Sequence, residues 1–180
     1  MKTVIIIDMQ EDFITGPLGT KKAQSIVPTV KEIIQEAIDH HDTLLYTLDT
    51  HTSDYADTLE GKELPIPHCI KPSTGWEITK LHGLDTLLNP TSAYCIEKPT
   101  FGATNLPHYI SDNTEEIILV GVCTDICVIS NALLLRASFP NTPITVYEDA
   151  CAGTTPDNEQ AALAVARSCQ IQIKTYKGGH

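Results

Sequence analysis

The sequence predicts a doubly wound α/β domain with a mostly parallel, six-stranded sheet covered by helices on both faces. Three observations favour this class. The predicted strands, such as residues 116–122 (EIILVGV), are apolar along their length, as in strands buried on both faces. Segments with a helical period separate several strands. The 180 residues suffice for one domain of ordinary size, so we expect residues 1–180 to form a single domain.

The expected elements follow one another in an alternating order. Apolar runs of strand length predict strands over residues 3–7, 43–48, 93–97, 116–122, 144–147 and 171–175. Apolar side chains at helical spacing predict helices over 25–40 and 125–137, and an Ala-rich run that begins at Pro156 predicts a third helix over 156–168. Residues 50–75 form a long irregular stretch rich in His, Asp, Thr, Pro and Gly, and loops of that length are usually functional.

Composition excludes several classes of protein. The chain has 12 basic and 23 acidic residues, a net charge of −11, so we expect no nucleic-acid partner and no anionic membrane partner. The apolar stretches are too short to span a bilayer, and the N-terminal one is too short for the core of a signal peptide. We therefore expect a cytoplasmic protein whose six cysteines are thiols.

Polar side chains follow several predicted strands, where this class of sheet gathers its active site. Asp8 ends the first strand, Lys98 ends the third, and Cys127 begins the helix after the fourth. A carboxylate can deprotonate a thiol, and both an ammonium group and a helix N-terminus lower a thiol pKa. Backbone amides of the turn over residues 122–127 can form an oxyanion hole. Together these groups favour covalent acyl transfer, although Cys127 alone also suits a buried apolar position, and spacing does not separate it from Cys123.

A second group of polar residues lies in the long irregular stretch. In the sequence Asp49-Thr50-His51 the two outer side chains share one face of an extended segment, and His68 follows further along. Two imidazoles and a carboxylate suit zinc, iron or manganese. A further oxygen ligand is available from Asp54, Asp57, Glu60 and Glu63. On spacing alone, a hydrophilic loop with incidental histidines is an equal alternative.

Four motifs, in order along nearly the whole chain, resemble those of the isochorismatase-like cysteine hydrolases. They are residues 7–13 (IDMQEDF), 98–103 (KPTFGA), 121–128 (GVCTDICV) and 149–152 (DACA). The resemblance implies the α/β fold of that family and a triad in which Asp8 is the base, Lys98 its cationic partner and Cys127 the nucleophile. It also implies a cis peptide bond between Val122 and Cys123, with the amides of Cys123 and Cys127 forming the oxyanion hole.

Further motifs resemble the nicotinamidase branch of this family and its metal site. They are residues 49–51 (DTH), 67–69 (PHC) and 75–77 (GWE). The resemblance implies one divalent metal ion, preferably zinc, with iron or manganese as alternatives. Its ligands would be Asp49, His51 and His68. Glu60, nine residues after His51, is preferred as the fourth ligand over Asp57 or a water molecule.

The resemblance implies hydrolysis of a small carboxamide, with nicotinamide as the expected substrate, through a Cys thioester within NAD salvage. Phe13, Leu18 and Phe101 are the expected walls of the substrate pocket. The family is often oligomeric, so we expect a homo-oligomer. Departures from the family pattern, such as Thr104 in place of an aromatic residue, fall on the pocket. Another amide or ureido/carbamoyl hydrolase with the same triad and a non-catalytic metabolite-binding protein are the alternatives.

Overall fold

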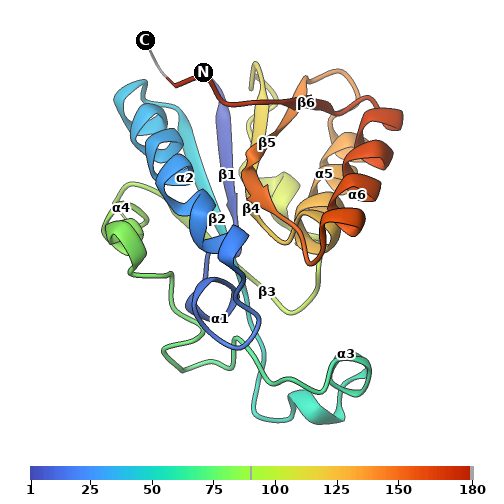
Figure 1. Ribbon diagram of the computed structural model, residues 1–180. Helices are drawn as coiled ribbons and strands as arrows, with labels where there is room; N and C mark the ends of the chain where they lie inside the picture. Colours follow the sequence, from blue (N-terminus) through green and yellow to red (C-terminus); the bar gives the residue numbers. More distant parts are fainter. Residues whose placement is uncertain (90, 179–180) are drawn as a thin grey trace.

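A six-stranded sheet forms the centre of the computed structural model, which describes residues 1–89 and 91–178 (Figure 1). The strand order is β3-β2-β1-β4-β5-β6, and every pair of neighbouring strands in the sheet is parallel. The doubly wound α/β class is therefore confirmed, and the sheet is all-parallel rather than mostly parallel. The strands are β1 (Thr3–Ile7), β2 (Thr43–Asp49), β3 (Tyr94–Lys98), β4 (Ile117–Val122), β5 (Ile144–Ala152) and β6 (Gln172–Lys174).

The strand β5 differs most from the sequence prediction, which ended it at residue 147. Its pairing with β4 shifts register, so that the chain advances from 119 to 121 in β4 but from 146 to 151 in β5. The half-buried Glu148 and Asp149 lie in this irregular part. Their polar side chains interrupt the apolar pattern although the strand continues to Ala152.

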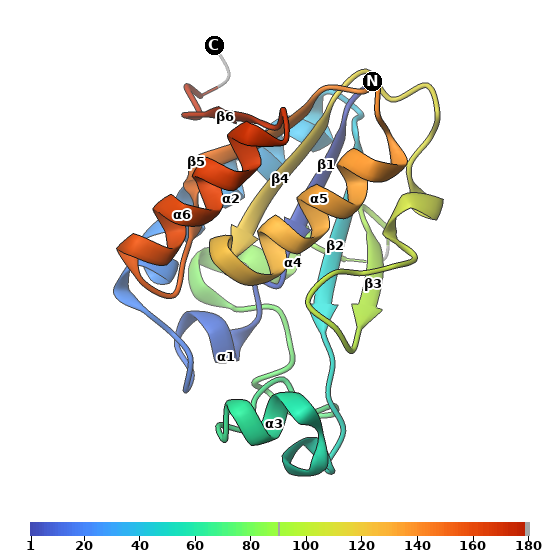
Figure 2. The ribbon, with the colours of Figure 1, turned by 90° about the vertical axis from the view of Figure 1, so that its right-hand side faces the viewer.

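Helices cover both faces of the sheet. The α-helices of the described residues are α1 (Glu11–Ile14), α2 (Lys21–Asp39), α3 (Leu59–Glu63), α4 (Leu84–Leu87), α5 (Ile129–Ser138) and α6 (Pro156–Ser168). Figures 1 and 2 show α2 and α4 on one face and α5 and α6 on the other. In β1, Val4 and Ile6 pack in the core on the side of α2, whereas Ile5 and Ile7 pack in the core on the side of α5 and α6.

The helix predicted over residues 125–137 forms two parts. A π-helical turn (Thr124–Val128) precedes α5, and Val128 N donates a hydrogen bond to Cys123 O at 3.1 Å across five residues. The spacing of apolar residues did not reveal this π-helical turn, because five residues are too few to distinguish it from an α-helix.

The helix predicted over residues 25–40 begins earlier in the structure, as α2. Thr20 Oγ1 accepts a hydrogen bond from Ala23 N and caps the helix at residue 20.

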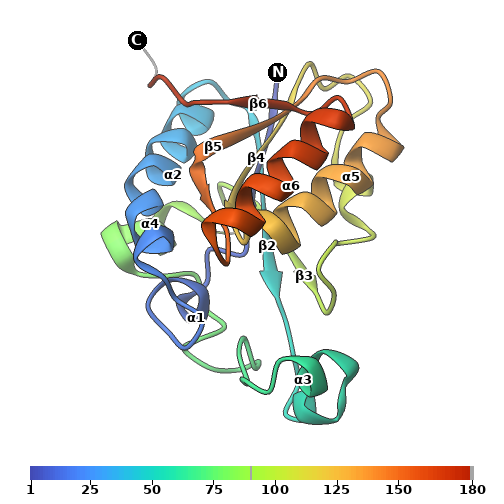
Figure 3. The ribbon, with the colours of Figure 1, turned by 45° about the vertical axis from the view of Figure 1, so that its right-hand side comes forward.

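The sheet order places the ends of β1 and β4 side by side at its centre. The order reverses between these two strands, and such a switch point is where this fold class binds its ligands. Asp8 follows β1 and Cys123 follows β4. In Figures 2 and 3, α3 lies beyond the carboxyl ends of the strands.

Over residues 1–89 and 91–178, no helix has the length and apolar character needed to cross a membrane.

Gly121 allows β4 to approach β1 closely at this switch point, and we predict that Gly121→Ala destabilises the fold. Its φ is +120°, and a Cβ atom there would lie 2.1 Å from the backbone oxygen of Ile7. Because backbone atoms cannot move aside, the substitution should lower the free energy of unfolding by about 3 kcal/mol in urea titrations. Gly102→Ala is the control: its Cβ would meet Ser130 at 3.5 Å, and we expect a change below about 1 kcal/mol. Equal effects of the two substitutions would contradict this explanation.

Candidate active site

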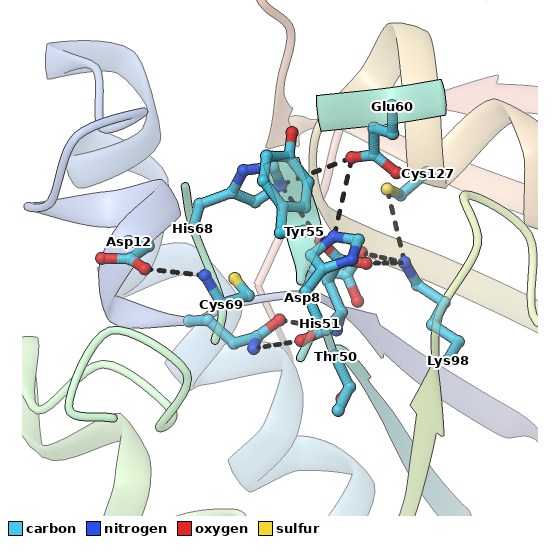
Figure 4. Close-up of polar contacts among 12 residues, drawn as sticks. Asp8, Asp12, Thr50, His51, Tyr55, Glu60, His68, Cys69, Lys98 and Cys127 are labelled. Carbon is cyan, nitrogen blue, oxygen red and sulfur yellow. Dashed lines mark hydrogen bonds and ion pairs between the residues drawn. The ribbon is translucent and has the colours of Figure 1, made fainter. Parts of the chain in front are cut away.

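Asp8, Lys98 and Cys127 meet in the interior at the carboxyl ends of the strands (Figure 4). Lys98 Nζ lies 2.7 Å from Asp8 Oδ2 and 3.5 Å from Cys127 Sγ. The other carboxylate oxygen, Asp8 Oδ1, accepts a hydrogen bond of 2.6 Å from Thr47 Oγ1. Asp8 and Lys98 are at most 1% exposed and Cys127 is 5% exposed. The structure thus brings together the three residues that the sequence predicted as a triad.

The protonation of this group differs from the expectation that the helix N-terminus favours a thiolate. Burial, together with the negative charge of Asp8, raises the pKa of Cys127 well above its ordinary value, although Lys98 opposes this. Burial also raises the pKa of Asp8, again against the effect of Lys98. These surroundings therefore favour the neutral thiol over the thiolate at rest. The raised pKa makes Asp8 a stronger base, so the geometry suits a proton transfer from sulfur to Asp8 during attack rather than a preformed thiolate.

A second cluster of side chains lies beside the triad. Asp49 Oδ2 lies 3.0 Å from His51 Nε2 and 3.3 Å from His68 Nε2. Glu60 Oε1 from α3 lies 3.6 Å from His51 Nε2 and 3.5 Å from His68 Nε2. The four candidate ligand atoms lie within 4.8 Å of one another. The structure thus brings together the predicted ligands with Glu60 as the fourth, whereas Asp57 is exposed and lies outside this cluster.

The chemistry of this cluster fits a divalent metal ion. His68 Nδ1 lies 2.9 Å from Ile66 O as a hydrogen-bond donor, so a neutral His68 carries its lone pair on Nε2, facing Asp49 and Glu60. Burial alone would lower the pKa of His68, but hydrogen bonds to Asp49 and Glu60 outweigh it and raise the pKa to about 10. The same cluster lowers the pKa of Asp49. The cluster therefore favours a positive charge at its centre. Two imidazoles with two carboxylates form a common donor set for zinc.

Buried hydrogen bonds hold the backbone around Asp49 in place. Gln10, fully buried, accepts a hydrogen bond from Asp49 N at 2.7 Å and donates to Asp49 O at 2.8 Å. It also donates to Trp76 O at 2.8 Å. Asp12 Oδ2 accepts a 2.8 Å hydrogen bond from the backbone of Cys69, next to His68. The IDMQEDF motif thus supports the candidate metal cluster and also supplies Asp8, the candidate base.

Tyr55 is a site residue that the sequence analysis missed. Its ring lies 4.8 Å from the His51 ring and 5.1 Å from the His68 ring, centroid to centroid, in edge-to-face arrangements. Its hydroxyl donates a 2.9 Å hydrogen bond to Leu64 O, and the side chain is 2% exposed. An aromatic residue in an otherwise polar loop, four positions after His51, was the available signal. Tyr55 therefore packs against both imidazoles, where it can orient them.

Asn131 is a second missed residue, on the side of the nucleophile. Its fully buried side chain donates to Cys127 O at 2.7 Å and to Phe101 O at 3.2 Å. Its oxygen accepts a 2.8 Å hydrogen bond from Ala103 N. Asn131 therefore joins the turn that carries Cys127 to the segment after β3. The sequence signal that could have revealed Asn131 was a polar residue one helical turn after Cys127.

A cavity of about 760 Å³ opens between the two groups of residues. Asp49, His68, Cys123 and Cys127 contribute to its wall. The three expected pocket residues, Phe13, Leu18 and Phe101, also line it. The cis peptide bond expected between Val122 and Cys123 is present. The part of the cavity wall that the structure describes contains no Lys or Arg. That the amides of Cys123 and Cys127 bind an oxyanion stays a prediction.

We predict that Tyr55→Ala lowers zinc affinity about tenfold, because residues that orient metal-binding imidazoles contribute to affinity on that scale. Tyr55→Phe keeps both ring contacts and should stay within about threefold of the unchanged protein. Tyr109→Ala removes a 44% exposed ring elsewhere and is the matched control. Competition against a chelator with known zinc affinity measures all three variants. If Tyr55→Ala binds zinc as tightly as Tyr109→Ala, Tyr55 does not position the ligands.

Comparisons with known proteins agree with this architecture. The family model described as the isochorismatase domain matches residues 2–176. A nicotinamidase/pyrazinamidase from Bacillus subtilis superposes with a TM-score of 0.83 at 25% identity, covering 97% of this chain and 100% of that one. A pyrazinamidase from Pyrococcus horikoshii in complex with zinc has a TM-score of 0.81 at 24% identity over 97% and 99%.

An N-carbamoylsarcosine amidase from Thermoplasma acidophilum has a similar fold, with a TM-score of 0.78 at 22% identity over 100% of this chain and 99% of that one. No curated protein matches the sequence. The match to the family model covers nearly the whole sequence, and the matched span contains Asp8, Lys98 and Cys127. The chain belongs to the isochorismatase family of hydrolases.

Proposed function

We propose that this hydrolase is a metal-dependent cysteine amidohydrolase that converts nicotinamide into nicotinate and ammonia. The observation that carries the proposal is that the metal-binding cluster and the nucleophile share one cavity. Asp49 and Cys127 both line it, and Lys98 Nζ lies 3.5 Å from each, at Asp49 Oδ1 and Cys127 Sγ. The similarity at 25% identity to the nicotinamidase/pyrazinamidase from Bacillus subtilis supports the same substrate class.

The charge of the cavity supports an uncharged substrate. Asp49, Glu60 and Glu63 contribute carboxylates to the wall, and its described part has no cationic side chain. With a divalent ion neutralising Asp49 and Glu60, Glu63 remains as a wall carboxylate that would repel a substrate with its own carboxylate. This argues for nicotinamide over N-carbamoylsarcosine, which is an anion. The buried contacts among Asp8, Lys98 and Cys127 favour catalysis over simple binding, since a binding protein has no use for a base beside a thiol.

The side chains present can carry out each proton transfer of the reaction. Asp8 takes the proton of Cys127 as the sulfur attacks the carbonyl carbon, and the amides of Cys123 and Cys127 donate hydrogen bonds to the oxyanion. Protonated Asp8 then gives its proton to the departing ammonia as the C–N bond breaks, which leaves a thioester. Asp8 next deprotonates the water that attacks the thioester carbon, and the proton on Asp8 passes to the Cys127 sulfur as the C–S bond breaks. The released acid gives its proton to ammonia and leaves as nicotinate. Lys98 stays protonated throughout and holds the Asp8 carboxylate in place.

The metal site has a separate task. Asp49, His51, Glu60 and His68 would hold a divalent ion, which would supply Lewis acidity for the ring nitrogen of the substrate. We propose zinc for this ion, and the zinc-bound pyrazinamidase neighbour supports that choice. The proposal further includes NAD salvage in the cytoplasm, a homo-oligomeric enzyme, and no nucleic-acid or membrane partner. The net charge of −11 supports the last of these.

The direct test of the proposed function is ammonia release from nicotinamide before and after metal removal. We expect turnover that chelation abolishes and that added zinc restores. Iron and manganese, added separately, identify the preferred metal. Undiminished turnover in protein that elemental analysis finds free of metal would contradict metal dependence. No release from the zinc-loaded protein would contradict the assignment of nicotinamide.

The assignment of the nucleophile predicts different effects for two neighbouring cysteines. Cys127→Ala should lower kcat by about 10⁴-fold or more, because removal of the nucleophile stops acylation. Cys123→Ala should retain activity to within about tenfold, because its predicted role uses the backbone amide alone. Thermal unfolding of both variants checks that the fold is intact. An active Cys127→Ala protein together with an inactive Cys123→Ala protein would show that Cys123 is the nucleophile.

A further inference from the structure

The cavity extends beyond what a pyridine carboxamide needs. At ~30 Å³ per water molecule, about 760 Å³ corresponds to roughly 25 waters, and pockets of ~300–1,000 Å³ typically take drug-sized ligands. The wall runs from Asp49 at the end of β2 to Ala152 at the end of β5. These strands are separated by β1 and β4, so the cavity crosses three strand spacings, ~14 Å at ~4.8 Å each. A ring held between Asp49 and Cys127 leaves much of this space free.

The mouth of the cavity carries exposed apolar side chains. Leu59, on α3, is 76% exposed, and Phe101, after β3, is 47% exposed. Both line the cavity, together with Leu64 at the end of α3. We call Leu59, Leu64 and Phe101 the apolar rim. Exposed apolar groups that border a pocket mark a surface that a ligand covers, and in Figure 3 α3 lies apart from the other helices, beyond the strand ends.

We propose that the apolar rim binds an apolar group attached to the ring of the substrate, so that the preferred substrates are pyridine carboxamides with an aryl or branched alkyl substituent. This inference rests on the proposed function and specifies its substrate class. The substituent carries no negative charge, because the described part of the cavity wall offers no cation and Glu63 lies near the rim on α3.

The proposed position of the substrate fixes where the substituent is attached. With the ring nitrogen at the metal cluster and the carboxamide at Cys127, positions 2 and 4 lie next to the carboxamide, and position 6 lies next to the nitrogen. Position 5 is adjacent to neither group. A substituent there points away from both the metal ligands and the nucleophile, towards the mouth of the cavity.

The test compares kcat/KM for 5-phenylnicotinamide and nicotinamide. We expect the ratio to be about tenfold or more in favour of the phenyl compound, because apolar groups in an apolar pocket discriminate on that scale. Leu59→Ser should lower this ratio by about threefold or more, since it removes apolar contact area from the rim. Val165→Ser is the matched control, because Val165 is 48% exposed on α6 and does not line the cavity. It should leave the ratio unchanged.

The possible outcomes separate this inference from the proposed function. Turnover of nicotinamide with a ratio near one overturns the inference and leaves the function standing. If the zinc-loaded protein hydrolyses neither amide, the proposed function fails, and calorimetric binding to zinc-loaded Cys127→Ala protein decides the inference. At least about tenfold tighter binding of the phenyl compound supports the rim assignment, and equal binding or none overturns it. A loss of self-association in Leu59→Ser by light scattering, with an unchanged ratio, assigns Leu59 to a subunit interface and also overturns it.

Discussion

The buried ion pair between Asp8 and Lys98 is the interaction on which the site depends. Its two atoms lie 2.7 Å apart in a region with almost no exposure to solvent. Removal of Lys98 would leave the buried charge of Asp8 without an ionic partner, which typically costs about 3–5 kcal/mol. Such a pair is rarely a favourable way to stabilise a fold compared with apolar packing. Its value here lies in the proposed chemistry, because Lys98 also contacts Cys127 and Asp49 and so joins the proposed nucleophile, base and metal cluster.

The sheet makes this convergence possible. The backbone delivers Asp8, Asp49 and Lys98 from the ends of three neighbouring strands, and the turn after β4 adds the nucleophile. Neighbouring strands lie ~4.8 Å apart, which is close to the reach of these side chains. Gly121 lets β4 approach the end of β1, where Asp8 begins the connection to α1 with a φ of +50°. Packing of the sheet thus sets the distance across which a proton moves.

The parts of the molecule that the sequence predicted are those with a simple local signal. Buried strands such as β1 and β4 need continuous apolar runs, and the polar residues that follow them mark the edge of the site. The resemblance to a family supplied the roles of Asp8, Lys98 and Cys127. Tyr55 and Asn131 were not predicted, because their importance comes from contacts with segments distant in the sequence. No local sequence pattern indicates such contacts. The raised pKa of the Cys127 thiol was not predicted for a related reason. The helix N-terminus is visible in the sequence, whereas complete burial beside Asp8 is a property of the fold.

Charge balance connects the two halves of the site. The buried and half-buried carboxylates of Asp8, Asp49 and Glu60 face one ammonium group, that of Lys98. With His51 and His68 neutral, as metal ligation requires, this group carries two excess negative charges. A divalent ion would neutralise them, whereas without one the hydrogen bonds to Asp49 and Glu60 favour a proton on His68. A neutralised metal cluster also leaves Lys98 free to act mainly on Asp8 and Cys127. The proposed metal binding and the proposed base catalysis would therefore be coupled through Lys98, since its ammonium group contacts both Asp8 and Asp49.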